Sequence, residues 1–223
     1  MYATAHLADD GLSGSGTWRL AARRLRGAPG LHYSAAAAAA PLGETAKPQL
    51  GRQALIAFWS DRDAAETALA GTRFGDDFAG LSIGMEAIRC VGAWTGVPAE
   101  LPSAPDRLHD GPTAVITIGR LRLLQARRFF AAGTKAERHV LASPGLTWGT
   151  GLAAPEKRTL FTLSWWHDHD AMDATARGAG DHLEAMKRQG EKDFHHESAF
   201  IRFRPMVAAG SLAGRNPVSG LAA

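Results

Sequence analysis

The chain carries one pattern of residues twice. Each copy opens on Pro-Gly-Leu, at 29–31 and at 144–146, and runs through an apolar stretch into a Trp-x-Asp-x-Asp-Ala motif, at 59–64 and at 166–171. The copies lie about 110 residues apart, which is longer than the roughly 20–50 residues of solenoid and propeller repeats. A unit of this length is a small α+β module, so the sequence predicts a duplicated architecture.

The ends of the copies support the duplication. A glycine-rich turn that closes on proline, at 92–98, returns at 210–217 with one additional residue. A copy of about 110 residues buries only a modest core by itself, which favours two halves that share one core. We therefore predict a single domain over residues 1–223, built of repeats at about 1–98 and 112–217 and joined by the proline-rich linker 99–111.

Composition narrows the function classes. Hydrophobic residues make up 45% of the chain and charged residues 21%, as in a globular protein, and a net charge of +3 gives no broad basic surface for nucleic acid. Cys90 is the single cysteine, which excludes an intramolecular disulfide and a cysteine-based metal cluster. The sequence has no secretory signal and no run of 18 apolar residues, so we expect a cytoplasmic protein without a transmembrane segment.

Apolar periodicity and turn residues predict the order of elements. Strands are expected near 4–8, 31–34, 54–59, 86–94, 114–118, 146–148, 159–166 and 199–206, and helices near 17–26, 61–70, 121–130, 135–141, 168–177 and 181–189. The six alanines at 35–40 favour a helix by propensity, but Pro41 and Gly43 follow them, so we predict a loop there.

Each copy thus has the order β-α-β-β-α-β, which is the ferredoxin-like unit. Two such units side by side pack their sheets into a barrel, which covers the open sheet faces. The predicted fold class is α+β, with two tandem ferredoxin-like repeats that form a dimeric α/β barrel within one chain. The alternative is an ordinary α+β sandwich.

The second copy is predicted to hold the functional site. Five of the nine histidines fall between residues 167 and 196, and the predicted helix 181–189 has no counterpart in copy one. On that helix His182 shares a face with Met186, by the spacing of three and four residues. This arrangement suits an axial ligand that faces a flat apolar cofactor, and it equally suits a half-buried surface histidine.

The other histidines of the second copy fit a metal site less well. His195 and His196 are adjacent on an extended segment, so at most one of them faces a given pocket. A three-ligand zinc or iron site would need His167 and His169 with a carboxylate. We favour helix capping for the intervening Asp168. Motifs for a P-loop, a Rossmann turn or a nucleophile elbow are missing, so oxidative chemistry would depend on a bound group.

Three segments of the second copy, at 142–151, 161–166 and 194–205, resemble the spheroidene monooxygenase family, the acyclic carotenoid 2-ketolases. The resemblance extends over most of the chain. It implies a dimeric α/β barrel, bound haem b and O2-dependent oxygenation of a hydrophobic molecule. Haem in related barrels is commonly held by a histidine on a helix of the C-terminal half, and His182 best matches that placement. His196 is the second choice, and His195 or His196 would otherwise line the distal side as catalytic residues.

We expect the cofactor pocket in the second half of the barrel. Its predicted lining consists of Trp148, Phe161, Trp165, Met186 and Phe200, with Arg202 or Arg204 near the cofactor. Strand alternation puts Phe161 and Trp165 on one face of their strand, and Arg202 and Arg204 on one face of theirs. An arginine among aromatic residues suits a propionate or a carboxylate substrate. The alternative is that the aromatic residues are plain core and the arginines reach solvent.

The expected function is that of a haem-dependent monooxygenase acting on a small hydrophobic substrate, a carotenoid or a secondary metabolite, with O2. An external electron donor and self-association into a homo-oligomer are left open. Three alternatives stand beside it: a haem-dependent dehydratase of the aldoxime-dehydratase type, a non-catalytic binder of haem or an apolar ligand, and a cofactor-free oxygenase.

Overall fold

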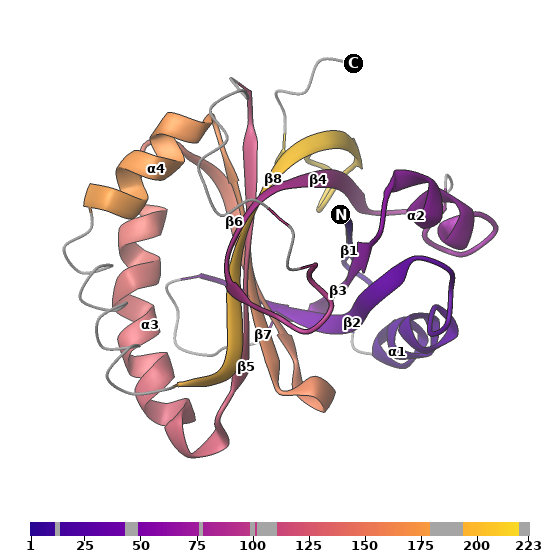
Figure 1. Cartoon of the computed structure of the whole chain (residues 1–223), viewed down its shortest axis with the longest axis horizontal. Helices are drawn as coiled ribbons and strands as arrows, with labels where there is room; N and C mark the ends of the chain where they lie inside the picture. The colour runs from indigo at the N-terminus through magenta and orange to yellow at the C-terminus, as the bar shows by residue number, and fades with distance from the viewer. Residues whose placement is uncertain are drawn as a thin grey trace.

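Eight antiparallel strands close into one barrel with helices outside it (Figure 1). This computed structural model describes residues 1–11, 14–42, 49–75, 78–98, 101, 111–178 and 194–218. The first repeat consists of β1 (Tyr2–Ala8), α1 (Ser15–Arg24), β2 (Leu31–Ala40), β3 (Gln49–Trp59), α2 (Arg62–Leu69) and β4 (Leu81–Ala93). The second consists of β5 (Thr113–Leu121), η2 (Leu123–Gln125), α3 (Ala126–Leu141), β6 (Leu146–Ala154), η3 (Pro155–Lys157), β7 (Thr159–Trp166), α4 (His169–Gly178) and β8 (His195–Gly210).

The strand order β1-β3-β2-β6-β7-β5-β8-β4 confirms the predicted fold class. Each repeat supplies four adjacent strands, β4-β1-β3-β2 and β8-β5-β7-β6, which is the ferredoxin-like order. Two seams join the repeats. The long one pairs β4 with β8, and the short one pairs residues 38–40 of β2 with 151–153 of β6. The barrel thus forms within one chain, and the alternative sandwich is wrong.

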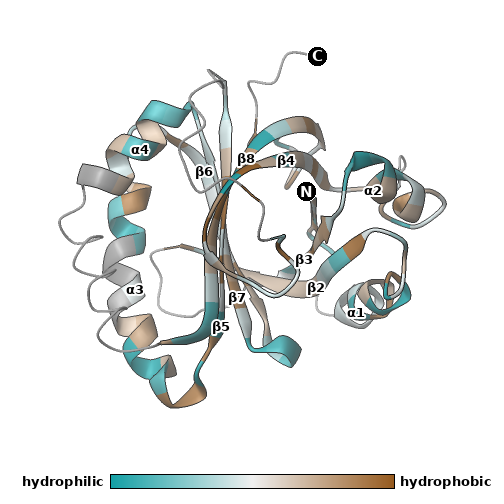
Figure 2. Ribbon diagram, in the orientation of Figure 1, coloured by the Kyte–Doolittle hydropathy of each residue, from teal (hydrophilic) through white to brown (hydrophobic). Residues whose placement is uncertain are grey.

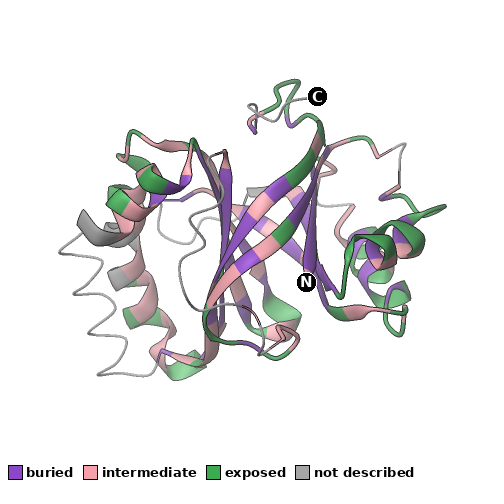
Figure 3. Cartoon of the chain, turned by 45° about the horizontal axis from the view of Figure 1, so that its top comes forward, coloured by how far each residue is buried: buried purple, intermediate pink, exposed green. Residues whose placement is uncertain are grey.

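Alternate strand residues fill the barrel interior, and the others face the helices. Figure 3 shows the buried residues running along the strands. The interior is apolar and draws on both repeats, with Ile56, Met85, Ile116 and Phe203 all fully buried in it. The two glycine-rich turns add Trp94 and Leu212 to the same core. Because β4 and β8 are antiparallel neighbours, these turns lie at opposite ends of the barrel.

The two repeated motifs form one structural unit in space. Asp61 and Asp168 are N-terminal caps, and their side chains accept hydrogen bonds from Ala64 N (2.8 Å) and Ala171 N (2.7 Å). The Pro-Gly-Leu turn packs against the same helix start, and a Cβ on Gly30 would lie 2.6 Å from that of Ala64. The backbone of Gly30 also accepts a hydrogen bond from the residue before the cap, at 2.8 Å.

The second repeat reproduces this unit. Gly145 abuts Ala171 so closely that a Cβ there has no room, and its carbonyl accepts a hydrogen bond from His167 N at 2.9 Å. Both repeats therefore make the same close contact between a turn and the start of a helix, and this contact explains why Pro-Gly-Leu and Asp-x-Asp-Ala recur together. The equivalence of Trp59 and Trp166 also holds, because each ends its strand opposite the first residues of the neighbouring strands.

Several predicted elements differ from the structure, and the strands predicted at 54–59, 86–94 and 146–148 are longer, at Gln49–Trp59, Leu81–Ala93 and Leu146–Ala154. The six alanines are not a loop, because residues 31–40 form β2. The two helices predicted at 121–130 and 135–141 are one helix, α3, preceded by the turn η2. The last strand begins at His195 rather than at 199. The helix predicted at 181–189 and most of the linker 99–111 lie outside the described residues. None of the helices in the described ranges has both the length and the apolar character needed to cross a bilayer.

Candidate functional site

Among the residues that the structure describes, the outward side of the second repeat's sheet has fewer buried side chains over it than that of the first. In the first repeat, α1 and α2 cover a cluster that includes Trp18, Leu55, Trp59 and Phe74, all 6% exposed or less. In the second, the cluster beneath α3 and α4 has three buried members among the described residues. Figure 1 shows the two helix pairs on opposite sides of the barrel.

Comparing equivalent positions of the two repeats shows where the cover of the two sheets differs. His6 and Leu55 are cross-strand partners in the first sheet, and both are buried. With the two tryptophans aligned, their counterparts are Thr117 and Thr162, which are likewise cross-strand partners. Thr117 is exposed and Thr162 is half-buried. Together with half-buried Phe200, which pairs with Thr117, they define what we call the open sheet face.

The cover of the first sheet comes from the segment after α2. Phe74 and Phe78 lie over His6, with ring centroids 5.2 Å and 5.4 Å from its own. His182 and Met186, the predicted axial ligand and its predicted neighbour, follow α4 in the sequence and lie outside the described residues.

His195 lies beside the open sheet face, at the start of β8. Its ring packs edge-on against Phe129 of α3, with centroids 5.0 Å apart. A Cβ on Gly119 would come within 2.5 Å of this ring, so the glycine leaves the space that the imidazole fills. Burial lowers the pKa of His195, which favours the neutral form. His196 is exposed, as the alternation of adjacent strand residues requires.

Arg202 is 2% exposed and joins β8 to α4. Its Nη2 donates a hydrogen bond to Asp173 Oδ1 at 2.7 Å, and its Nη1 lies 2.9 Å from Nδ1 of His169. Burial, and then the nearby Arg202 charge, lowers the pKa of His169. The sequence reasoning missed this cluster, although His169 and Asp173 are four residues apart on a predicted helix and Arg202 stands in an apolar strand.

The predicted lining residues divide between the two sides of the sheet. Phe161 and Trp165 lie in the barrel interior, and half-buried Trp148 packs against the same core. Phe200 and Arg202 lie on the outward side, as strand alternation from Ile201 and Phe203 requires.

Arg204 follows on the same side as Arg202. Its side chain is 36% exposed and lies 4.0 Å from a carboxylate oxygen of Glu86. The alternative of a metal site at His167 and His169 finds no support, because Asp168 caps α4 and no cluster of three metal-binding side chains occurs within the described residues.

Comparison with known proteins agrees with the resemblance noted in the sequence. The chain is 28% identical over 175 residues to a spheroidene monooxygenase of Rubrivivax gelatinosus, covering 76% of this chain and 66% of that one. It is 24% identical over 184 residues to the one from Cereibacter sphaeroides, covering 79% and 56%. The chain thus spans less than two thirds of the length of these curated relatives. No family model matches the chain.

The fold has matches among solved structures. A crystal structure of aldoxime dehydratase superimposes with a TM-score of 0.56 at 8% identity, over 92% of this chain and 80% of that one. At this identity the likeness concerns the fold alone. The chain is thus similar in sequence to proteins named spheroidene monooxygenase, and it shares its barrel fold with aldoxime dehydratase.

Proposed function

We propose that this protein is a monooxygenase that oxidises a hydrophobic small molecule, a carotenoid or a secondary metabolite, with haem b bound over the open sheet face. The main support for this proposal is that the outward surfaces of the two sheets differ in how far side chains cover them. The same outward surface that is sealed by aromatic residues in the first repeat presents Thr117, Thr162 and Phe200 in the second. The similarity to proteins named spheroidene monooxygenase supplies the reaction class.

The residues present fit a haem in the following way. Haem is a flat apolar ring with two carboxylates, and the open sheet face has Thr117 at its centre, flanked by Thr162 and by the aromatic ring of Phe200. His182 would be the proximal ligand, with Met186 beside it, and His196 is the second choice. Arg204 is better placed than Arg202 to bind a propionate, since Arg202 is already held by Asp173. Bound haem would supply the activation of O2, with electrons from an external donor.

The chain's own groups would orient the substrate and handle protons. His195 favours the neutral form, so its ring can accept a proton at one nitrogen while Phe129 fixes its plane. The Arg202–Asp173 pair holds α4 against β8 and so fixes one wall of the site. Phe161 and Trp165 would support the sheet from the interior rather than touch the cofactor.

Absorption spectroscopy gives the first test. Purified protein supplied with haem should show a Soret band, and His182→Ala should lose or shift it. His167→Ala is the matched control, because this side chain is 82% exposed on the same half of the barrel. A wild-type protein that stays colourless after haem addition would overturn the cofactor assignment.

The oxygenase reaction is tested separately from haem binding. Reduced haem-loaded protein incubated with an acyclic carotenoid under labelled O2 should give a product that carries the label. Turnover that persists without O2 would favour chemistry of the aldoxime-dehydratase type. Tight haem binding with no turnover of any oxidisable apolar substrate would favour a binding protein.

A further inference from the structure

The turn η2 presents two adjacent leucines to solvent. Leu123 is 65% exposed and Leu124 is 96% exposed, the largest values among the large apolar side chains that the structure describes. Figure 2 shows an apolar segment where the chain passes from β5 into α3. Single exposed leucines are common on protein surfaces, but two at the tip of a tight turn form a protruding apolar point.

Two exposed cations follow this apolar tip. Arg127 and Arg128 begin α3 directly after the turn. Arg120, at the end of β5, is instead paired with Glu197 at 2.8 Å. An apolar point beside exposed arginines is complementary to a bilayer with anionic headgroups, which offers hydrocarbon beneath a layer of negative charge.

A cationic pocket lies at the same end of the barrel. Thr159 at the start of β7 pairs with Arg120 at the end of β5, and Leu121 N donates to Arg158 O at 2.9 Å. The residues directly after η3 are therefore hydrogen-bonded to the end of β5, which leads into the leucine turn. The turn η3 also forms one wall of a shallow surface pocket, whose cavity volume of about 20 Å³ opens to solvent.

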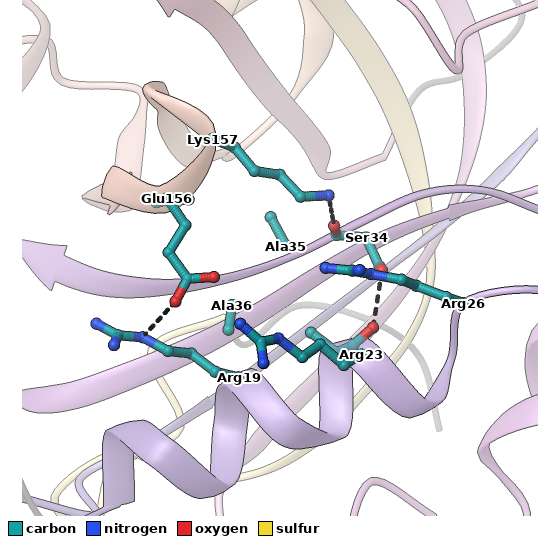
Figure 4. A pocket seen from close by; sticks show the side chains of 10 residues that line it. Arg19, Arg23, Arg26, Ser34, Ala35, Ala36, Glu156 and Lys157 are labelled. Atoms are coloured by element: carbon teal, nitrogen blue, oxygen red, sulfur yellow. Dashed lines mark hydrogen bonds and ion pairs between the residues drawn. The ribbon is translucent and has the colours of Figure 1, made fainter.

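Four cations and one carboxylate are among the residues lining this pocket, which we call the cationic pocket: Arg19, Arg23, Arg26, Lys157 and Glu156. Figure 4 shows their side chains converging over Ala35 and Ala36, whose small size leaves room for the pocket. Arg19 Nε lies 3.4 Å from Glu156 Oε1. Because this carboxylate balances only one of the four cations, the pocket stays positive. Burial, and then the charge of Arg26, lowers the pKa of Lys157. A bound anion would relieve this repulsion.

We propose that this end of the barrel docks on an anionic lipid bilayer. Leu123 and Leu124 enter the acyl region, and the cationic pocket takes a lipid phosphate. The two parts come from both repeats, since α1 belongs to the first and η2 and η3 to the second. Each part alone would bind weakly, and their presence on one end lets both engage a single surface.

Docking here would bring the bilayer to the candidate site. Arg122, directly before the leucines, donates from its backbone N to Phe194 O at 2.9 Å and from Nε to His195 O at 3.1 Å. An apolar substrate dissolved in the membrane would then reach the open sheet face beside His195 without crossing water. This entry route rests on the proposed function, whereas docking itself does not.

Vesicle co-sedimentation of the full chain tests the docking. Wild-type protein should bind phosphatidylcholine vesicles that contain phosphatidylglycerol, and bind pure phosphatidylcholine vesicles more weakly. The double change Leu123→Ser with Leu124→Ser should weaken binding about tenfold or more, because two buried leucines are lost. Met206→Ser with Val207→Ser is the matched control. These residues are 42% and 40% exposed near the far end of β8, and the change should leave binding intact.

The pocket has its own pair of variants. Arg23→Ala with Arg26→Ala should reduce binding to anionic vesicles severalfold, whereas Arg24→Ala, an exposed arginine outside the pocket lining, should change it little.

Undiminished binding by the leucine variant overturns the proposal. So does a wild-type protein that binds inorganic phosphate but no vesicles, since that identifies a site for small anions. A leucine variant that only converts a dimer into a monomer would assign the turn to self-association. Because no turnover is measured, failure here leaves the oxygenase proposal untouched.

Discussion

At the scale of single residues, burial decides the protonation of His6. Its side chain is 2% exposed beneath Phe74 and Phe78, and burial lowers its pKa from 6.5 to about 4. In the unfolded chain His6 is protonated below about pH 6.5, whereas in the folded chain it stays neutral down to about pH 4. His6 therefore leaves stability intact above pH 6.5 and reduces it as the pH falls from 6.5 to about 4. The slope is about 1.4 kcal/mol per pH unit, or about 3 kcal/mol in all.

Urea unfolding at a series of pH values checks this expectation. His6→Gln should flatten the loss of stability between pH 6.5 and 4, while His32→Gln, at an exposed position, serves as the control. Lowered pKa values at His169 and His195 act in the same direction, so a residual slope is expected in the variant. An unchanged slope in His6→Gln would contradict the assignment of the effect to this residue.

The same scale explains why the site was only partly predictable. Alternation along β7 and β8 correctly grouped Phe161 with Trp165 and Phe200 with Arg202. It could not reveal which group faces the interior, because each side of β7 carries a buried tryptophan. Trp165 and its neighbour Trp166 are 1% and 4% exposed on opposite sides. Residues from two surfaces were therefore combined into one predicted pocket.

At the scale of elements, prediction succeeded where local signals agreed. The strand expected at 159–166 has those bounds, and the helix expected at 168–177 forms at His169–Gly178 behind its aspartate cap. The loop predicted at the six alanines was wrong, because Pro41 ends the strand there instead of breaking it and because tertiary pairing overrides local signals. Strand β3 flanks them on one side and β6 on part of the other, and the alternate residues Ala35, Ala37 and Ala39 enter the core. None of these partners is local in sequence.

The helix–turn contact made by each repeat predicts a glycine requirement. Gly145→Ala should destabilise the protein by about 1–3 kcal/mol, because its new methyl group would overlap Ala171 in a packed region. Thermal or urea unfolding measures the loss. Adding Ala171→Gly to the variant should recover part of it, since the double change restores the space.

Gly16→Ala is the control for that experiment. A Cβ at Gly16 meets nothing within 4 Å, and the residue lies in α1, so the change should be neutral or stabilising by up to about 1 kcal/mol. Equal losses at both glycines would mean that backbone freedom, rather than the contact with Ala171, accounts for the effect.

At the scale of the whole molecule, each repeat depends on the other for its core. Ile56 and Met85 of the first repeat and Ile116 and Phe203 of the second are fully buried in one shared interior. Separation would expose one complete apolar sheet face on each half, as well as the strand edges of both seams. We therefore expect one cooperative unit rather than two domains in tandem.

This dependence gives a direct test of the single-domain prediction. Residues 1–98 and 112–218, produced separately, should each aggregate or lack a cooperative unfolding transition. Produced together, they should associate into a barrel, because the β4–β8 and β2–β6 pairings need no covalent linker. A full chain cut at a protease site placed within 99–111 should likewise stay folded and elute as one species. If either half alone gave a cooperative transition of native-like stability, the repeats would be independent domains and the shared interior would not be what holds the molecule together.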